Sequence, residues 1–214
     1  MVNRMNMRLS LLILSIAAVL LFAGCSGKGE ESKQNGHNVA AKSMSWDKMP
    51  EMMINLNKSY SASFHTSKGV FKVKLYADEA PVTVNNFLFL AREGFYDGQE
   101  FHSIIESFMI QTGDPNGNGT GTPGYSIPDE LDTGMRYEEG IVAMANAGKA
   151  NSGGSQFFIC VGPDAENLNK EPIYTIFGKV ESGMEVVQEI SKTPVKNGVP
   201  LEKVIIESIV IHEI

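Results

Sequence analysis

Cysteine is scarce in this sequence, and its scarcity limits how the fold can be held together. The 214 residues include only two cysteines, Cys25 and Cys160, and a single tryptophan. Cys25 ends an N-terminal apolar segment, whereas Cys160 lies inside the apolar run 157–161. A disulfide between such different surroundings is not expected. The fold must therefore be stabilised by its hydrophobic core.

Positive charge is also in short supply. Lysine and arginine number 18 against 25 aspartates and glutamates, which gives a formal net charge of −7. A nucleic-acid-binding protein needs a basic surface to neutralise phosphates, and electrostatic adhesion to an anionic membrane surface needs one too. The composition therefore argues against both kinds of binding.

The spacings typical of metal and nucleotide sites are missing as well. The glycine-rich residues 117–121 lack the Lys-Ser/Thr pair and the helix of a phosphate loop, so an ordered surface loop is favoured. Cys160 is interpreted as a small core hydrophobe rather than a nucleophile. The histidines are isolated from one another and from both cysteines, which leaves no metal-ligand spacing: His37, His65, His102 and His212. We expect no metal and no cofactor.

The N-terminus carries a pattern typical of export. Arg4 and Arg8 precede an apolar run over residues 9–22. This run is shorter than the about 20 residues that a membrane-spanning helix needs, and it suits the apolar region of a signal peptide. The mature domain is therefore expected outside the cytoplasm.

Residues 21–25, Leu-Phe-Ala-Gly-Cys, resemble a bacterial lipoprotein signal, with Phe22 in place of the commoner aliphatic residue. The resemblance implies a signal peptide over residues 1–24. It also implies acyl chains on Cys25, which would anchor the protein to the outer face of the bacterial cell membrane. An ordinary signal peptide cut elsewhere, or an uncleaved anchor, is the alternative.

Residues 25–58 are predicted to be a flexible linker that carries the lipid-attachment cysteine. Residues 26–42 are polar and show no apolar periodicity, so they cannot bury enough surface to fold. Residues 44–56 hold Trp46 and several methionines. This stretch is either a short helix that packs on the domain or the last part of the linker. The folded domain is predicted over residues 59–214.

The domain begins with a pattern typical of a β-hairpin followed by a helix. Strand-like runs at residues 61–66 and 70–76 flank the turn signal Ser67-Lys68-Gly69. Pro81 suits the first turn of a helix that Gly94 ends. Within this helix a buried stripe recurs at the i, i+3, i+4, i+7 spacing: Val84, Phe87, Leu88 and Ala91.

Short strands outnumber helices in the remainder of the domain. Residues 101–114 are interpreted as two short strands broken at Glu106-Ser107, and a second helix is predicted over residues 183–192. Further strands are predicted at residues 140–145, 156–161, 174–180 and 204–211. No βαβ rhythm is present, so the sequence predicts a mainly β fold, an antiparallel barrel capped by two α-helices.

One group of apolar and amide side chains suits a binding pocket. Aromatic rings beside amides would hold an uncharged ring next to a groove that hydrogen-bonds an extended peptide. The members of this group are Phe108, Met109, Gln111, Asn146, Gln156 and Phe158. By composition alone, its apolar members could equally be core residues.

Four ordered segments resemble the signature segments of the cyclophilin family of peptidyl-prolyl isomerases: FHSIIESFMIQTGD, GIVAMANAG, GGSQFFI and YTIFGKV. The resemblance covers roughly residues 60–211. It implies a closed, eight-stranded antiparallel barrel with an α-helix at each end. The implied reaction is rotation about an Xaa-Pro amide, which has an uncatalysed barrier of about 18–20 kcal/mol and takes tens to hundreds of seconds.

The resemblance also implies roles for individual residues. Phe108, Gln111 and Ser103 occupy the positions of the catalytic group. The substrate-binding positions are Met109, Ala145, Asn146, Gln156, Phe158, Leu168 and Tyr174. The proline ring would lie among the apolar members of these two sets, and amides would hold the flanking peptide. The expected substrates are Xaa-Pro segments of unfolded or exported proteins, bound by a monomer.

Ser103 departs from the family pattern, because the family's catalytic arginine follows the Phe-His pair and this chain has serine there. A guanidinium can donate a charged hydrogen bond to the amide nitrogen as conjugation breaks, whereas a hydroxyl on one carbon is short and uncharged. Losing one such donor costs about 3–4 kcal/mol, or about 10²–10³ in rate. Asn167 is a second departure, at a position where some members carry tryptophan.

Two functions stay open at this point. The first is an isomerase that assists the folding of exported proteins, with activity reduced by Ser103. The second is a proline-peptide binding module or holdase that keeps the groove and has little isomerase activity. A further idea gives Lys149, on a neighbouring loop, the role of the missing arginine.

Overall fold

A computed structural model describes residues 44–214 of the chain. The predicted signal peptide, the predicted lipid-attachment residue Cys25 and the polar residues 26–42 lie outside the described residues. Among the residues that are described, no helix has both the length and the apolar character needed to cross a membrane.

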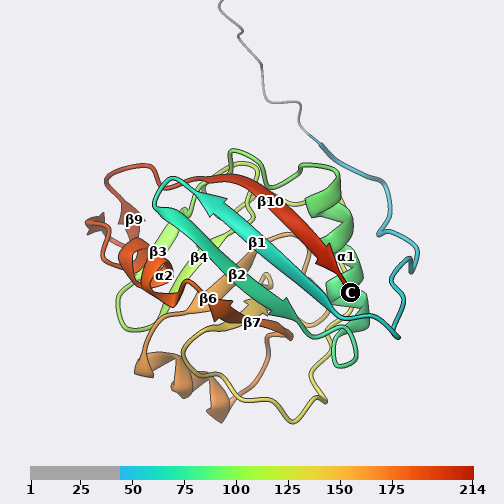
Figure 1. Ribbon diagram of the computed structural model, residues 1–214. Helices are drawn as coiled ribbons and strands as arrows, with labels where there is room; N and C mark the ends of the chain where they lie inside the picture. Colours follow the sequence, from blue (N-terminus) through green and yellow to red (C-terminus); the bar gives the residue numbers. More distant parts are fainter. Residues whose placement is uncertain (1–43) are drawn as a thin grey trace, which may run out of the picture. The chain divides into compact units, whose positions relative to one another are not determined.

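One antiparallel sheet of eight strands forms the domain, in the order β10-β1-β2-β7-β5-β6-β4-β3 (Figure 1). A separate short hairpin pairs β8 with β9. The mainly β, antiparallel prediction is confirmed. The strands are β1 Tyr60–Thr66, β2 Gly69–Leu75, β3 Ser103–Ile105, β4 Met109–Thr112, β5 Ile141–Met144, β6 Phe157–Cys160, β7 Ile176–Ser182, β8 Val195–Lys196, β9 Val199–Pro200 and β10 Ile206–Glu213.

The sheet is open, so the predicted closed barrel is wrong in this respect. Within residues 44–214 the edge strands β3 and β10 share no ladder. β3 has only three residues, and the N–H of Ile104 donates to the carbonyl of Gly198 between β8 and β9, at 2.8 Å. The bridge between Glu100 and Ile205 and a few main-chain bonds beside it span the gap. Because the edge strand is so short and its N–H is already used, the sheet curls into a half-barrel without a closing ladder.

Two α-helices lie at opposite ends of the sheet, α1 Pro81–Arg92 and α2 Met184–Ser191 (Figure 1). Pro81 occupies the first turn of α1, and Gly94 follows its end at φ +73°, a conformation that glycine adopts at no steric cost. The free N–H groups of the first turn are satisfied from a distant loop. The Glu130 carboxylate accepts from the N–H groups of Val82 and Thr83 at 3.0 and 2.8 Å.

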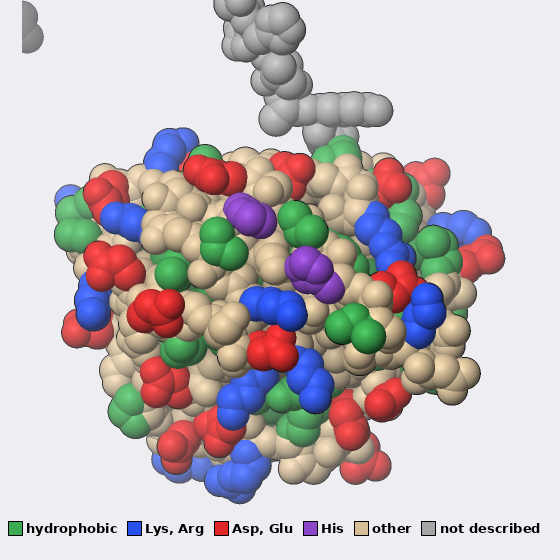
Figure 2. All heavy atoms as spheres, viewed as in Figure 1, with side chains coloured by type: hydrophobic (Ala, Val, Ile, Leu, Met, Phe, Trp, Pro, Cys, Tyr) green, Lys and Arg blue, Asp and Glu red, His purple; other side chains and the backbone are tan. Residues whose placement is uncertain are grey.

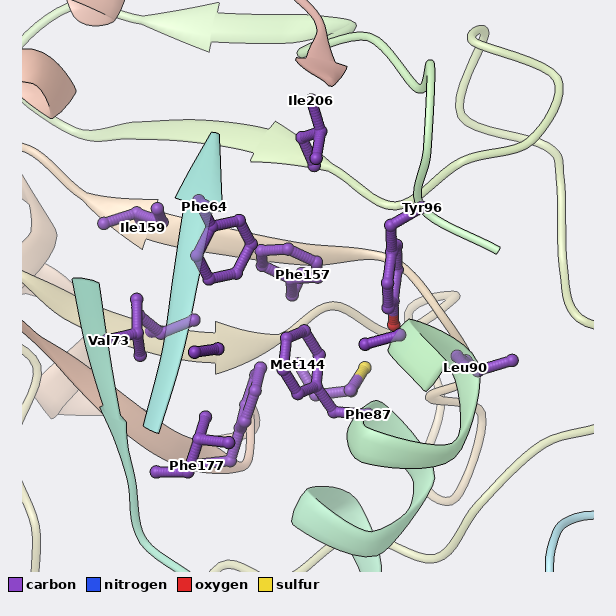
Figure 3. Close-up of a cluster of buried hydrophobic side chains, with 14 of the residues drawn as sticks. Phe64, Val73, Phe87, Leu90, Tyr96, Met144, Phe157, Ile159, Phe177 and Ile206 are labelled. Carbon is purple, nitrogen blue, oxygen red and sulfur yellow. The ribbon is translucent and has the colours of Figure 1, made fainter. Parts of the chain in front are cut away.

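The inner face of the sheet holds the main core, which is rich in aromatic rings. Figure 3 shows Phe64, Phe87 and Phe157 together with Tyr96 and Phe177. Phe87 meets Phe157 edge-on at a centroid distance of 5.8 Å and an interplanar angle of 88°. Such pairs contribute about 0.5–1.5 kcal/mol beyond area burial. These packed rings stabilise the domain.

The outer face of β4, β5 and β6 carries a second, smaller core. Side chains alternate along a strand, so Ile110 and Ile159 point into the main core while their neighbours point the other way. The outward-pointing residues form a separate cluster that includes Met109, Phe158 and Cys160. Two 4-residue strands buried on both faces explain why the sequence could not separate pocket residues from core residues.

Figure 2 shows the face formed by β10, β1 and β2, where acidic and basic side chains are interspersed. Ion pairs on these strands and beside them include Lys72 with Glu181 at 3.3 Å and Lys58 with Glu213 at 3.0 Å. Exposed pairs of this kind contribute about 0–1 kcal/mol each. This face therefore differs from the single-signed basic surface that nucleic acids require.

Residues 44–56, which the sequence left open as helix or linker, are not helical. The segment is extended and runs past α1 to the start of β1 (Figure 1). Met44, Trp46 and Ile54 pack against the main core, whereas Met49, Met52 and Met53 are exposed. This segment therefore packs on the folded domain from residue 44, the first that the structure describes. The 3-10 helix η1, Pro163–Lys170, is a further element that the sequence did not predict.

Candidate active site

A hollow of about 190 Å³ opens on the outer face of the sheet. The residues come from β4, from the ends of β5 and β7, and from β6, so strand pairing gathers segments that are far apart in the sequence. Every residue that lines this hollow is one that the sequence nominated: Phe108, Met109, Gln111, Ala145, Asn146, Phe158 and Tyr174.

Strand register aligns three of the predicted site residues. Ser103 on β3 is opposite Gln111 on β4, and Gln111 is opposite Phe158 on β6. Residues directly opposite one another point to the same face of a sheet. The three side chains therefore form one row across the outer face, with Ser103 at the edge.

A second hollow of about 300 Å³ adjoins the first and shares Gln111, Ala145 and Asn146 with it. Residues 119–126 are here called the rim loop, and six of them form the far wall of the hollow: Gly119, Thr120, Gly121, Thr122, Tyr125 and Ser126. Gln156 lines this second hollow rather than the first. Together the two hollows form an extended groove with an apolar end and an amide-rich end.

A chain of amides fixes the orientation of Gln111. Its Nε2 donates to Oε1 of Gln156 at 2.9 Å, and Nε2 of Gln156 donates to the carbonyls of Gly121 and Gly119 at 2.9 and 3.2 Å. Since Nε2 of Gln111 is held by Gln156, its Oε1 is left to accept a hydrogen bond from a peptide N–H.

The Asp114 carboxylate organises the chain that leads into the rim loop. It is 1% exposed and accepts from the N–H groups of Asn116 and Asn118 at 2.8 and 2.9 Å, and from that of Gly119. Burial opposes ionisation, yet these backbone donors and the nearby His102 hold the pKa of Asp114 below its usual range. The ionised carboxylate therefore holds the loop that Gln156 contacts.

Aromatic side chains shape the apolar end of the groove. The rings of Phe158 and Tyr174 meet edge-on, at 5.3 Å and 89°. Tyr137 holds Tyr174 from both sides, since its hydroxyl donates to the Tyr174 carbonyl at 2.5 Å and accepts from the Tyr174 N–H at 3.0 Å. Burial raises the pKa of Tyr137. The sequence does not single out Tyr137, because this residue lies in an irregular segment without a motif.

The turn between β3 and β4 fixes Phe108. Ser107 adopts φ +62°, and its carbonyl accepts from the N–H of Asp164 at 2.9 Å. The carbonyl of Phe108 accepts from the N–H of Val161 at 3.0 Å. The predicted break at Glu106-Ser107 is confirmed, and it is this left-handed residue that turns Phe108 over the hollow.

Ser103 is half-buried and does not line either hollow. Neighbouring strands are about 4.8 Å apart, so Ser103 lies one strand from Gln111 and about 10 Å, two strands, from Phe158. A hydroxyl on a single carbon cannot cover that distance. The structure thus separates Ser103 from the apolar end of the groove.

The remaining predicted positions lie around the groove rather than in it. Leu168 on η1 packs against the smaller core without lining the hollow. Asn167 is exposed on η1, where its side chain donates to the carbonyl of Asp164 at 3.1 Å. Lys149 is exposed on the loop after β5.

Other candidate reactive groups are poorly suited to catalysis. Cys160 is fully buried, and burial raises the pKa of its thiol to about 12. Burial also lowers the pKa of His102, partly offset by the charge of Asp114. Within residues 44–214, no three His, Cys, Asp or Glu side chains are grouped so that they could hold a metal ion. What the site offers is an apolar hollow with hydrogen-bonding amides beside it.

Comparison with known proteins gives a consistent result. Residues 61–211 match the family model described as cyclophilin type peptidyl-prolyl cis-trans isomerase/CLD. A crystal structure of a Cryptosporidium parvum cyclophilin-type isomerase superposes with a TM-score of 0.67 at 36% identity, covering 72% of this chain and 98% of that one. A second structure of that protein, determined in the presence of the dipeptide Ala-Pro, has a TM-score of 0.66 at 37% identity, covering 71% and 98%.

Relatives of known sequence include proteins of similar length and much longer ones. Peptidyl-prolyl cis-trans isomerase B of Streptomyces anulatus is 41% identical over 171 residues, which cover 71% of this chain and 95% of that protein. Mouse peptidylprolyl isomerase domain and WD repeat-containing protein 1 is 46% identical over 159 residues, but these cover 72% of this chain and only 24% of that much longer protein. The match in fold, motifs and length shows that the chain belongs to the cyclophilin-type peptidyl-prolyl cis-trans isomerases, a family of enzymes.

Proposed function

We propose that the groove binds an Xaa-Pro segment, with the proline ring in the hollow between Phe108, Met109 and Phe158. Gln111 and the main chain at residues 145–146 would hold the flanking peptide. The observation that carries this proposal is that all the residues lining one hollow of about 190 Å³ belong to the set nominated from the sequence. Leu168 and Tyr174 would support the apolar wall.

The reaction requires only that the twisted amide be favoured over the planar one. The planar amide is stabilised by resonance that separates charge between nitrogen and oxygen. Apolar walls solvate that charge separation poorly, so holding the ring among Phe108, Met109 and Phe158 would lower the barrier. No covalent bond is broken, and no acid or base is needed.

Ser103 limits the rate acceleration that we expect. The groove lacks a charged donor at the position opposite Gln111, and such a donor contributes about 10²–10³ in rate. We therefore expect acceleration by the apolar hollow and Gln111 at a rate below that of an enzyme with arginine there. A water molecule bridged by Ser103 would supply at most an uncharged donor.

The second candidate function is a proline-peptide binding module or holdase with little isomerase activity. Ser103 supports this candidate, because it replaces the family's catalytic arginine while the apolar and amide residues that line both hollows remain. The two candidates differ in whether a bound peptide exchanges between cis and trans faster than a free one.

Three proteins test the binding site: the natural chain, Phe158→Ala and the exposed-site control Val210→Ala. Phe158 is 4% exposed, whereas Val210 is 43% exposed on β10. We expect Phe158→Ala to weaken the binding of an Ala-Pro peptide at least tenfold, and Val210→Ala to leave it unchanged. Equal affinities of the natural chain and Phe158→Ala, with both folded, would contradict the proposed location of the proline.

We also propose that the protein is exported and anchored to the outer face of the bacterial cell membrane through acyl chains on Cys25. The support is the apolar run of residues 9–22, which leads into Leu-Phe-Ala-Gly-Cys at residues 21–25. Exported proteins would then be its substrates. Metabolic labelling with palmitate should mark the natural chain and not Cys25→Ser, and an equally labelled Cys25→Ser variant would contradict the anchor.

A further inference from the structure

Residues 44–56, here called the strap, lie outside the family match at residues 61–211 and yet are bound to the domain. Trp46 is the main anchor. Its ring meets Phe89 at 5.2 Å and 68°, and Phe95 at 5.8 Å and 51°. Contacts of this size and geometry hold a segment in one place.

Two hydrogen bonds fix the strap to α1 farther along. The N–H of Met53 donates to Oδ1 of Asn85 at 2.8 Å, and Nδ2 of Asn85 donates to the carbonyl of Glu51 at 2.9 Å. Asn85 is only 3% exposed. A buried amide that bonds the same backbone twice is costly to leave unpaired, so the strap is part of the folded domain.

The strap also contacts the rim loop directly. The N–H of Trp46 donates to the carbonyl of Pro123 at 2.9 Å. Gly124 lies so close that a Cβ there would be 2.4 Å from Oγ of Ser45 and 2.5 Å from the carbonyl oxygen of Trp46. The backbones of strap and rim loop therefore touch at this point.

The other side of the rim loop faces the groove. Gly121 accepts from Gln156, which in turn orients Gln111. Tyr125 in the same loop donates to Oδ1 of Asn86 at 2.7 Å, and Nδ2 of Asn86 donates to the carbonyl of Gly154 at 2.7 Å. The rim loop is thus held between α1 and the strap on one side and the amide chain of the groove on the other.

We propose that the strap is a positioning element of the active site, and that Trp46 is its principal positioning residue. Pro123 and Gly124 lie between Thr122 and Tyr125, which line the second hollow. By holding these two residues, the strap positions the far wall on either side of them and the nearby Gly121 carbonyl that fixes Gln156. This inference rests on the proposed use of the groove as the site for an Xaa-Pro segment. Trp46 contacts Phe89, Phe95 and the rim loop at Pro123 and Gly124, so its effect on the amide chain passes through the rim loop.

A specific dependence on substrate length follows. A short Ala-Pro peptide occupies the apolar hollow, whereas a longer peptide also reaches the second hollow, whose wall the strap holds. Substitutions that act on a site through an intervening element change its free energies by amounts that correspond to about twofold to thirtyfold. Loosening the strap should therefore reduce kcat/KM for the longer peptide by that factor, through KM, and affect the short peptide less.

The test compares the full-length natural chain with Trp46→Ala, Trp46→Phe and the control Met49→Ala, which alters a 43% exposed strap residue. Isomerisation of an Ala-Pro tetrapeptide and of a ten-residue peptide with one central Ala-Pro is measured by exchange NMR, alongside hydrogen exchange of the rim loop. Trp46→Ala should raise KM for the longer peptide and speed amide exchange in residues 119–126. Trp46→Phe should restore most of both, and Met49→Ala should change neither.

Two outcomes would overturn the inference. One is unchanged amide exchange of the rim loop in a folded Trp46→Ala protein. The other is an equal loss for both peptides that follows the loss of thermal stability, which would mark Trp46 as a core residue only. If the natural chain isomerises neither peptide, the proposed catalysis fails, and the rim-loop exchange still decides whether the strap positions the loop.

Discussion

Replacing Ser103 with arginine should raise kcat/KM for an Ala-Pro peptide by about 10²–10³. Ser103 lies in register with Gln111, at the edge of the row that leads to Phe158. An arginine at this position has three methylene groups with which to cross from β3 toward the hollow, and its guanidinium is a charged, forked donor. The native hydroxyl has neither the reach nor the charge.

The magnitude follows from where the new donor would lie. The outer face beside the row is apolar, and Phe158 and Met109 are 4% and 6% exposed. Hydrogen bonds from charged donors are stronger in such surroundings than in water. A preorganised donor aimed at a site of developing charge lowers the activation barrier by about 2.7–4 kcal/mol, which corresponds to the stated gain in rate.

Exchange NMR on the natural chain and three variants measures this gain. Ser103→Lys supplies charge without the planar fork and should gain less than Ser103→Arg. Ser103→Met supplies length without charge and should gain nothing. A folded Ser103→Arg protein whose rate stays within twofold of the natural rate would refute the reasoning, and so would a Ser103→Met protein that gains as much.

Three further predictions concern the supports of the site. Gly113→Ala should destabilise the domain by more than about 1–3 kcal/mol in urea unfolding, since the φ of Gly113 is +84° and a Cβ would lie 2.2 Å from the Ser155 carbonyl oxygen. The control Gly117→Ala, at φ +65° with no atom within 4 Å of the added Cβ, should destabilise it less. Equal losses of unfolding free energy would contradict the steric reason. His102 has its pKa lowered below 6.5, chiefly by burial, so the unfolded chain binds the proton more readily and the unfolding free energy should fall from about pH 7.5 to about pH 5. His102→Gln should flatten that slope, and an unaltered slope would assign it to other groups. Cys160, with a thiol pKa of about 12, should resist iodoacetamide at about pH 8 in the native protein and react once unfolded, as peptide mapping can show; rapid native labelling of Cys160 would contradict its burial.

The sequence predicted those parts of the fold that depend on local pattern. Alternating side chains identified β1 and β2, and Pro81 and Gly94 bounded α1 within two residues. The polar break at Ser107 separated β3 from β4. Each of these signals lies within a few residues of the structure that it specifies, which is why a single sequence sufficed.

Features that depend on distant partners could not be predicted. Glu130 satisfies the first turn of α1 from 48 and 47 positions away. Tyr137 holds Tyr174 across 37 positions. The open edge of the sheet follows from the hydrogen bond that the Ile104 N–H donates to the Gly198 carbonyl, and no local sequence pattern predicts this contact. The roles of the strap and of the rim loop are unforeseen for the same reason.

For the candidate site too, the sequence predicted the residues but not their arrangement in space. Side chains on β4 and β6 could be nominated as pocket residues, yet the sequence could not tell which face they occupy, because both faces of these strands are buried. Register resolves this by putting Gln111 and Phe158 on the outer face. Leu168, predicted beside the proline ring, packs against the smaller core and does not line the hollow in the absence of a peptide.

The most direct test of catalysis by the groove is exchange NMR of one Ala-Pro peptide titrated with the natural, full-length chain in detergent. Binding and cis/trans exchange are read from the same spectra. The proposed isomerase predicts an exchange rate that rises in proportion to the concentration of the chain, and a loss of that rate in Phe158→Ala. A peptide that binds at the groove while its exchange rate stays at the uncatalysed value would contradict the isomerase and favour the binding module.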